Sequence, residues 1–130
     1  MPQRILIAED DSFTLRLMEK YLAARGYEVL KAGNGREAFQ MVLEYAPPIV
    51  ITDWMMPEMS GVELCRALRT QEGIGSVYIV LVTAHSDTER LIEAFEAGAD
   101  EFLAKPINRQ ELMARLRSEE RRVGKECRSR

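Results

Sequence analysis

The sequence predicts an α/β fold: a doubly wound, five-stranded parallel sheet with helices on both faces. The first observation behind this prediction is that three short apolar runs show no polar alternation, which indicates strands buried on both faces. The second is that segments with apolar residues at helical spacing separate the strands, so that a strand followed by a helix recurs five times. Right-handed crossovers between successive strands then distribute the helices over both sides of the sheet.

Five segments are predicted as strands. Three of them are the unbroken apolar runs, and two weaker segments fit beside these. In chain order the five are Ile5–Ala8, Glu28–Ala32, Ile49–Ile51, Val77–Val82 and Glu101–Ala104. The third strand is followed by the charged residue Asp53, which raises the question of why a strand that looks fully buried should end beside a carboxylate.

The helices are predicted from apolar stripes and from the residues that bound them. Gly26 is expected at the C-cap of the first helix, and Pro47–Pro48 cannot continue the second. Asp87 is expected to cap the fourth helix, which ends at Gly98, and Asn108 is expected to cap the fifth. The stripes are Leu15, Met18 and Leu22; Ala38, Met41 and Val42 within Gly35–Tyr45; Val62, Leu64, Cys65 and Leu68 within Ser60–Arg69; Leu91, Ala94 and Phe95; and Leu112 and Leu116.

Composition limits the class of protein. The 130 residues suit one domain, and 46% hydrophobic residues are enough for one sizeable core. A net charge of -3, from 18 basic against 21 acidic residues, gives no basic surface for nucleic acid. No apolar run approaches the roughly 18 residues that a membrane span needs. Cys65 and Cys127 lack CxxC spacing, which indicates free thiols in a reducing, cytoplasmic compartment.

One domain is expected over residues 1–118. After about Ser118 the helical stripe gives way to EERRVGKECRSR, a polar and basic stretch that contains Gly124. We expect residues 119–130 to be a disordered or non-native tail that takes no part in the fold.

Charged and polar side chains follow four of the predicted strands: Glu9–Asp11 after the first, Asp53 after the third, Thr83 after the fourth and Lys105 after the fifth. Because ligands of an open parallel sheet bind outside the carboxyl ends of its strands, we expect these groups to share one edge. Unrelieved carboxylates repel each other, and Mg2+ relieves that repulsion through oxygen ligands. An edge that joins Mg2+, a lysine and a hydroxyl to one further carboxylate suits a phosphoryl group, which Asp53 can accept as an aspartyl phosphate.

Each of these residues also has a purely structural interpretation. Glu9–Asp11 could cap the first helix, although Asp11 or Ser12 alone suffices for that, and Asp53 could cap a later helix. Thr83 could simply close a β-rich run, and Lys105 could be a solvated surface lysine. Their joint occurrence at strand ends favours the chemical interpretation.

Five stretches carry a family resemblance: ILIAEDD, IVITDWMMPEMSG, VYIVLVTA, EAGADEFLAKP and NRQEL, in this order and at compatible spacing. Over roughly residues 3–118 the chain resembles the receiver domain of bacterial two-component response regulators, of the chemotaxis-regulator type. The resemblance implies a flavodoxin-like receiver fold with strand order 2-1-3-4-5. It also implies a phosphorylation-dependent signalling switch that assists only its own phosphorylation and dephosphorylation, and therefore no conventional enzyme.

The resemblance implies a metal site at the predicted edge. Asp53 would be the phosphoacceptor and a metal ligand, Asp10 a direct Mg2+ ligand, and Glu9 a residue that acts on the ion through water. Met55 would offer its backbone carbonyl to the metal, so its apolar side chain is no obstacle.

The same resemblance implies roles around the phosphoryl group. Thr83 would contact one phosphoryl oxygen through its hydroxyl, and Lys105 would contact another after a cis peptide bond to Pro106. Phe102 occupies the position of the aromatic switch residue, with an ordinary core aromatic on an edge strand as an equal alternative. Because phenylalanine lacks the hydroxyl that a tyrosine would use when exposed, inward burial is expected in both states. Trp54, beside the phosphoacceptor, would be an optical reporter of the site.

By this resemblance a sensor histidine kinase would donate a phosphoryl group to Asp53. Thr83 would then move toward the group and Phe102 would fill the vacated space. The face formed by the fourth helix, fifth strand and fifth helix would repack for a downstream effector or an output domain outside this sequence. A homodimer through the fourth and fifth helices is a further expectation, with no contact between this domain and membrane or nucleic acid.

Three other functions fit the sequence less well. A phosphatase with an aspartate nucleophile on the first strand needs a DxD arrangement, which Glu9–Phe13 lacks. A flavin carrier on the same fold needs a neutral hydroxyl- or glycine-rich loop after the first strand. A receiver-like scaffold that no longer accepts phosphate requires spoiled geometry at the edge. His85, the only histidine, either has no role or, with Met55, tunes the access of water to the acyl phosphate.

Overall fold

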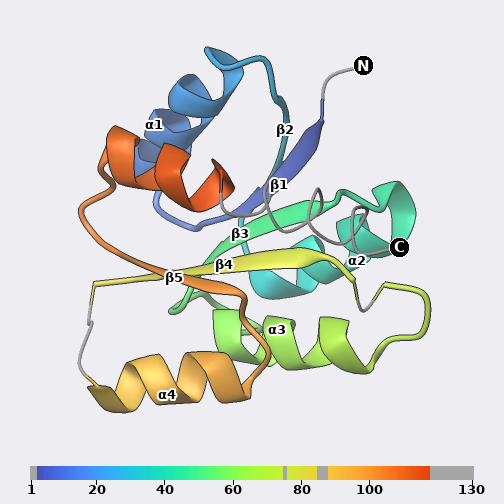
Figure 1. The fold of residues 1–130 in the computed structure, drawn as a ribbon. Coiled ribbons are helices and arrows are strands. Elements are labelled where there is room, and N and C mark those ends of the chain that lie inside the picture. The colour runs from blue at the N-terminus through green and yellow to red at the C-terminus, as the bar shows by residue number, and fades with distance from the viewer. Residues whose placement is uncertain (1–2, 75, 85–87, 118–130) are drawn as a thin grey trace, which may run out of the picture.

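The computed structural model describes residues 3–74, 76–84 and 88–117, and these residues build one five-stranded sheet. All neighbouring strands are parallel, and their order is β2-β1-β3-β4-β5, as predicted (Figure 1). The predicted strands are confirmed with bounds that shift by one or two residues. They are β1 (Arg4–Ala8), β2 (Glu28–Ala32), β3 (Ile49–Asp53), β4 (Tyr78–Thr83) and β5 (Glu101–Ala104).

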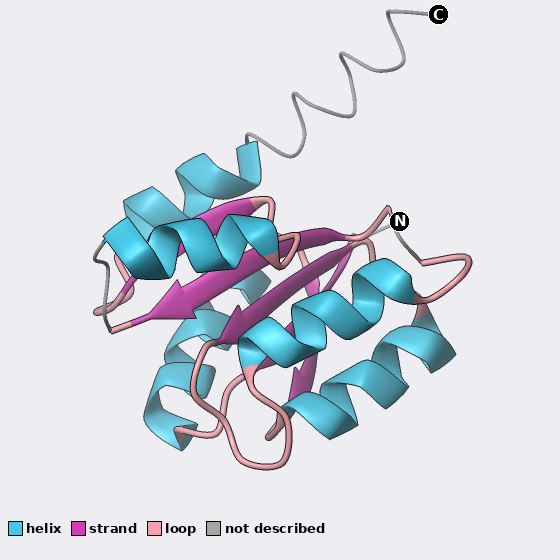
Figure 2. Cartoon of the chain, turned by 90° about the horizontal axis from the view of Figure 1, so that it is seen from below, coloured by secondary structure: helices cyan, strands magenta, loops and turns pink. Residues whose placement is uncertain are grey.

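Helices cover both faces of the sheet, also as predicted (Figures 1 and 2). Four of them are α1 (Ser12–Ala23), α2 (Gly35–Tyr45), α3 (Gly61–Thr70) and α4 (Thr88–Glu96). Residues 109–117 are also helical and are called the C-terminal helix below. The helices α2, α3 and α4 contribute to the core on one face, whereas α1 and the C-terminal helix contribute to the core on the other.

The two cores explain why the central strands read as unbroken apolar runs. In a strand, successive side chains point to opposite faces of the sheet. On β1, Leu6 and Ala8 join the core beneath α2, α3 and α4, whereas Ile5 and Ile7 join the core beneath α1 and the C-terminal helix. Both sets are fully buried, which explains why neighbouring positions of a central strand are apolar instead of alternating with polar ones.

Side-chain caps fix where the helices start. Ser60 and Glu63 cap α3 reciprocally: the hydroxyl of Ser60 accepts from the N–H of Glu63 at 3.2 Å, and the carboxylate of Glu63 accepts from the N–H of Ser60 at 2.9 Å. Asn108 caps the C-terminal helix as predicted, because its Oδ1 accepts from the N–H of Glu111 at 2.9 Å. The predicted cap Asp87 lies outside the described residues.

The end of α1 differs from the prediction. The C-cap is Ala24 and not Gly26, which lies two residues further along the chain. There Gly26 has a φ of 90°, a left-handed conformation that glycine adopts without steric cost. Its N–H donates to the carbonyl of Ala23 at 3.0 Å, so the last turn is tighter than an α-helix. Gly26 therefore ends the tightened turn that follows the helix.

Three other expectations concern the ends and the cysteines. The predicted tail at 119–130, together with Cys127, lies outside the described residues. Cys65 is a buried free thiol on α3, and burial raises the pKa of this thiol to about 11. Among the described residues, no helix combines the length and the apolar character that crossing a bilayer requires.

Candidate metal and phosphoryl site

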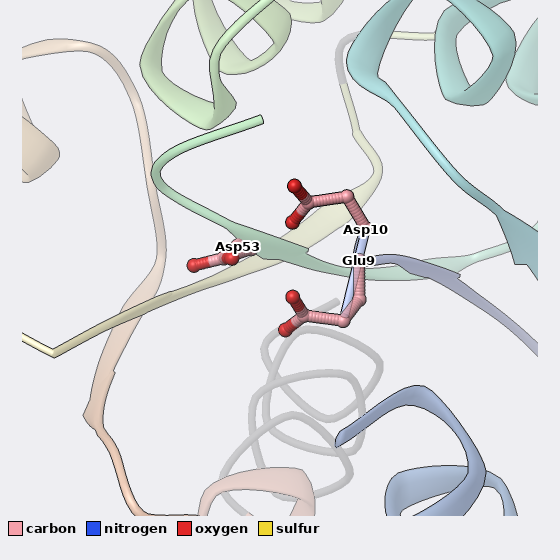
Figure 3. A group of neighbouring side chains, drawn as sticks. All are labelled: Glu9, Asp10 and Asp53. Atoms are coloured by element: carbon pink, nitrogen blue, oxygen red, sulfur yellow. The ribbon is translucent and has the colours of Figure 1, made fainter. Parts of the chain in front are cut away.

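Three carboxylates from two strand ends meet at the carboxyl edge of the sheet. Glu9 and Asp10 directly follow β1, and Asp53 is the last residue of β3. One oxygen of each carboxylate lies within 4.8 Å of the others. Figure 3 shows that Glu9 and Asp10 leave the end of β1 in opposite directions, as consecutive residues of an extended chain do. The two side chains therefore approach Asp53 from different sides.

The three carboxylates differ in their access to solvent. Glu9 is 1% exposed and Asp53 is 7% exposed, whereas Asp10 is an exposed residue. A buried carboxylate is costly unless it is hydrogen-bonded, paired with a cation or bound to a metal. Asp10 therefore lies on the solvent side of the cluster, and Glu9 is its most deeply buried member.

Hydrogen bonds of the sheet fix the backbone of the cluster. The N–H of Trp54 donates to the carbonyl of Val82 at 2.8 Å, which extends the pairing of β3 with β4 one residue past Asp53. The N–H of Glu9 donates to the carbonyl of Ala32 at 3.0 Å, which extends the pairing of β1 with β2. The carboxylates thus project from a rigid edge, which suits a site that must hold its geometry.

The start of α3 also lies close against this edge. The N–H of Gly61 donates to the carbonyl of Trp54 at 2.8 Å. A Cβ at Gly61 would clash with the backbone carbonyl of Asp53, so a residue without a side chain is needed there. Because of this close approach, the loop of residues 54–60 folds back and ends next to the end of β3.

Lys105 supplies the positive charge of the site. It directly follows β5, its N–H donates to the carbonyl of Thr83 at 2.8 Å, and its bond to Pro106 is cis, as the family resemblance implied. Its Nζ lies 3.2 Å from Oδ2 of Asp53 and 3.2 Å from Oε1 of Glu9. Partial burial acts to lower the pKa of Lys105, but the charges of the two carboxylates outweigh burial and raise it. The lysine is therefore fully charged.

Glu9 is the group of the cluster whose ionised form is disfavoured by its surroundings. Burial, and then its hydrogen bond and charge interaction with Asp53, raise the pKa of Glu9 from 4.5 to about 7. The N–H of Asp11, 3.2 Å from Oε2 of Glu9, and the ammonium of Lys105 act in the opposite direction without cancelling this effect. Within the described chain, Oε1 of Glu9 has its ion pair with Lys105 but no well-directed hydrogen bond.

This donor set fits a hard divalent cation. All three groups are carboxylates, and the buried oxygen of Glu9 lacks a full set of partners. Mg2+ binds proteins through one or two carboxylates and retains several waters, for which the exposed Asp10 leaves an open side. Additional positive charge would also stabilise the ionised form of Glu9.

Residues other than Glu9 and Asp53 cap the helices that these two carboxylates could have capped. Asp11 is the N-cap of α1: its Oδ2 accepts from the N–H of Thr14 at 3.0 Å, and the hydrogen bonds from Thr14 lower the pKa of Asp11. Ser60, and not Asp53, caps α3. Neither Glu9 nor Asp53 is therefore needed as a helix cap.

The remaining predicted residues differ in their burial and position. Thr83 ends β4, is 1% exposed and pairs with Ala104 in the sheet. The side chain of Met55 is exposed. Phe102 on β5 is partly buried and packs against the core beneath α2, α3 and α4. His85 lies outside the described residues.

One neighbour of the site was not indicated by the sequence. Arg90 on α4 lies with its guanidinium carbon 5.1 Å from the centroid of the Trp54 ring. Arginine is common on the polar face of a helix, so its type gives no signal of this contact. Only the packing of α4 beside the loop after β3 brings the two residues together.

Comparison with known proteins agrees with this geometry. The chain belongs to the response regulator receiver domain family, whose model matches residues 5–117. It is 37% identical to the DNA-binding response regulator MtrA of Mycobacterium tuberculosis over 122 residues, which are 94% of this chain and 52% of MtrA. The chain thus spans about half the length of the curated relatives it matches.

Solved structures give the same family. The CheY-like response regulator receiver domain protein of Methanospirillum hungatei JF-1 superposes with a TM-score of 0.88 at 26% identity, covering 97% of this chain and 99% of that one. The receiver domain of the sensor histidine kinase PA1611 of Pseudomonas aeruginosa PAO1 gives a TM-score of 0.84 at 28% identity, with 91% and 97% covered. The latter structure has a magnesium ion coordinated in its active-site cleft.

Proposed function

We propose that Asp53 of this receiver domain accepts a phosphoryl group from a sensor histidine kinase in an Mg2+-dependent reaction. The observation that carries the proposal is the joint placement of Asp53 with two further carboxylates and one ammonium at the edge of the sheet. The magnesium ion in the PA1611 receiver domain supports the choice of metal.

The proposed metal site consists of the three carboxylates and one carbonyl. Asp10 and Asp53 would bind Mg2+ directly, Glu9 would act through water, and Met55 would contribute its backbone carbonyl. The ion supplies positive charge that neutralises the phosphoryl oxygens during transfer. Glu9 and Asp10 hold and orient it beside Asp53, because their backbone is fixed by the ends of β1 and β2.

In the transfer step, a carboxylate oxygen of Asp53 forms a bond to phosphorus while the bond from phosphorus to the imidazole nitrogen of the kinase breaks. The departing imidazole keeps the electron pair of the broken bond. Lys105, with its Nζ 3.2 Å from Asp53, pairs with one phosphoryl oxygen, and the hydroxyl of Thr83 donates to another. Positioning and charge neutralisation of this kind provide most of the catalysis in phosphoryl transfer.

The proposed response to phosphorylation begins at Thr83. As its side chain moves toward the phosphoryl group, Phe102 on the neighbouring strand fills the space, and the face formed by α4, β5 and the C-terminal helix repacks. Leu91, Ile92 and Phe95 expose apolar surface on α4, which supports this face as a contact surface. A downstream effector, an output domain or a second copy of the chain would bind there.

The proposed setting follows from the family. We infer a receiver domain over residues 1–118, located in the cytoplasm, where the kinase would carry its phosphohistidine. MtrA is named as a DNA-binding response regulator and is about twice as long as the matched segment. In this chain we assign no DNA contact to the receiver domain itself, and residues 119–130 are proposed to lie outside it.

The test uses a small phosphodonor and a phosphoryl mimic. Phosphoramidate with Mg2+ should add one phosphoryl group to the wild type, measured by intact-protein mass, and a chelator should prevent it. Trp54 emission should change once on addition of Mg2+ and again on addition of beryllofluoride. In Asp53→Asn the phosphoryl adduct and the response to beryllofluoride should both be absent. A phosphoryl adduct that persists in Asp53→Asn would contradict the assignment.

A further inference from the structure

We propose that Arg90 is a positioning residue that couples helix α4 to the phosphoacceptor loop through its contact with Trp54. The inference rests on the proposed function of Asp53, which Trp54 directly follows. The guanidinium carbon of Arg90 lies 5.1 Å from the ring centroid, within the roughly 6 Å over which a cation is attracted to an aromatic face. The contact joins the active edge of the sheet to a helix that carries no residue of the site.

Trp54 is the fixed partner of this contact. Its side chain is buried in the core beneath α2, α3 and α4. Its backbone is held on both sides, because its N–H donates to Val82 and its carbonyl accepts from Gly61, each at 2.8 Å. A change in the distance between Arg90 and Trp54 must therefore come mainly from movement of α4.

The two ends of α4 are held by different kinds of contact. After its C-terminal end, the carbonyl of Gly98 accepts from Nε of Arg69 at 2.8 Å, and the same guanidinium donates to the carbonyl of Val77 at 2.7 Å. These bonds tie the turn after α4 to α3 and to the chain just before β4. Near its N-terminal end, Arg90 makes a cation–π contact, which is weaker and less directional than a pair of hydrogen bonds.

The body of α4 adds little further restraint. Ala94 is its one fully buried side chain, whereas Ile92 and Phe95 are about half exposed, at 52% and 48%. A helix held firmly at its C-terminal end and loosely along its length can tilt about that end. Its first turn, where Arg90 lies, would move farthest.

Thr83 supplies the displacement in the proposed function. It ends β4, and α4 begins at Thr88, so few residues of the chain separate the proposed shift of Thr83 from the first turn of α4. The Arg90–Trp54 contact occurs here together with an Asp53 carboxylate that is paired with Lys105. The contact therefore restrains α4 in the arrangement that goes with unmodified Asp53, and weakening it should favour the phosphorylated arrangement.

The first measurement is the emission of Trp54, which is the only tryptophan in the chain. In metal-free protein, Arg90→Met should change its intensity or wavelength, and Arg90→Lys, which keeps a cation, should restore part of the wild-type signal. Arg16→Met is the matched control, since Arg16 is an exposed arginine on α1, across the sheet from Trp54. Identical emission from the wild type and Arg90→Met would overturn the proposed contact.

The second measurement is the affinity for beryllofluoride at saturating Mg2+, determined by calorimetry. Arg90→Met should bind the mimic about two- to fivefold more tightly than the wild type, which corresponds to the lower part of the range of cation–π contacts. Arg90→Lys should lie between the two, and Arg16→Met should match the wild type. In a Trp54→Leu background the effect of Arg90→Met should vanish, because the partner is gone.

The outcomes separate the two proposals. Equal or weaker binding of the mimic by Arg90→Met, beside normal binding by the wild type, would overturn the coupling role and leave the function of Asp53 intact. An equal effect of Arg90→Met with and without Trp54 would also overturn it. No binding of the mimic by the wild type would overturn the proposed function, and the coupling role with it.

Discussion

Charged side chains lie at opposite edges of the same sheet. One edge has the pair of Arg69 and Asp100, and the other has the group of Glu9, Asp53 and Lys105. Nη2 of Arg69 lies 2.6 Å from Oδ2 of Asp100, and the same oxygen accepts from the N–H of Ile79 at 2.8 Å. One cation pairs with one anion there, and both side chains also form hydrogen bonds with backbone groups. At the other edge, Lys105 lies 3.2 Å from each of two carboxylates, with Asp10 as a third in the same cluster.

The difference lies in charge balance and not in the presence of charge. A balanced, hydrogen-bonded pair can serve as a structural tie, because each partner compensates the desolvation of the other. An acidic excess at a buried position destabilises the fold unless something else neutralises it. Burial, and then the neighbouring Asp53, raise the pKa of Glu9, so its ionised form is the one that this edge disfavours. The unbalanced edge is therefore the one that has capacity for a cation and a phosphoryl group.

The largest expected difference between the two edges comes from replacing one aspartate by asparagine at each of them. Asp53→Asn should reduce phosphoryl incorporation from phosphoramidate to background, because the nucleophile is removed. Asp100→Asn should leave incorporation close to the wild type but lower the free energy of unfolding, because a charge partner of Arg69 is lost. Intact-protein mass and urea denaturation measure the two effects. Loss of incorporation in a folded Asp100→Asn would show that the edges are not independent.

Removal of the cation should have unequal effects on stability at the two edges. Arg69→Met should lower the free energy of unfolding by about 2–4 kcal/mol, because Asp100 loses its cation and two carbonyls lose the donor that Arg69 provides. Lys105→Met should cost clearly less, because Glu9, with a pKa already near 7, can take up a proton. Urea denaturation near pH 7 without metal checks this. A larger loss in Lys105→Met would break the comparison.

Lys105→Met should also change metal binding. Loss of the ammonium 3.2 Å from both Glu9 and Asp53 should raise the affinity for Mg2+ by on the order of tenfold, since a competing positive charge is gone. Incorporation of the phosphoryl group should slow down in the same variant. Titration with Mg2+, followed by Trp54 emission, gives the affinity. A weaker affinity would mean that Lys105 orients the carboxylates more than it competes with the ion.

A further expected effect is a pH dependence of stability that originates at Glu9. Because its pKa is about 7 in the fold against 4.5 for an ordinary glutamate, the folded state binds more protons between these values. The free energy of unfolding should therefore fall as pH rises from about 4.5 to about 7, and level off above. Urea denaturation of the wild type and Glu9→Gln in chelator should show this slope in the wild type only. Saturating Mg2+ should reduce the slope, because it favours the ionised form.

Much of the edge could be predicted from the sequence, since parallel strands bring their carboxyl ends together. The run that ends at Asp53 and the lysine after the fifth strand are local features, and the topology converts their positions into proximity. The order of burial among the carboxylates was not accessible in this way. Glu9 and Asp10 are neighbours of similar type, and only the three-dimensional packing distinguishes the buried one from the exposed one.

Two side-chain pairs could not be predicted from the sequence for a different reason, namely the pair at the opposite edge and the contact that α4 makes with Trp54. Arg69 and Asp100 are 31 residues apart, and each is a common surface type on its own. Arg90 and Trp54 meet only because α4 packs beside the loop after β3. Such pairs depend on the relative placement of elements that are not consecutive in the chain. Gly26 is a milder case, because the tightening of the last turn of α1 moved the cap by two residues.

The backbone bond between Lys105 and Thr83 has a consequence for redesign of this domain. Because the amide of Lys105 is hydrogen-bonded to the carbonyl of Thr83 at 2.8 Å, the backbones of the two residues are held together. A designer who wishes to alter the lifetime of the modified form by moving the backbone of either residue would displace both. Independent adjustment would have to come from side-chain length at these two positions, and not from grafting a new loop after the last strand.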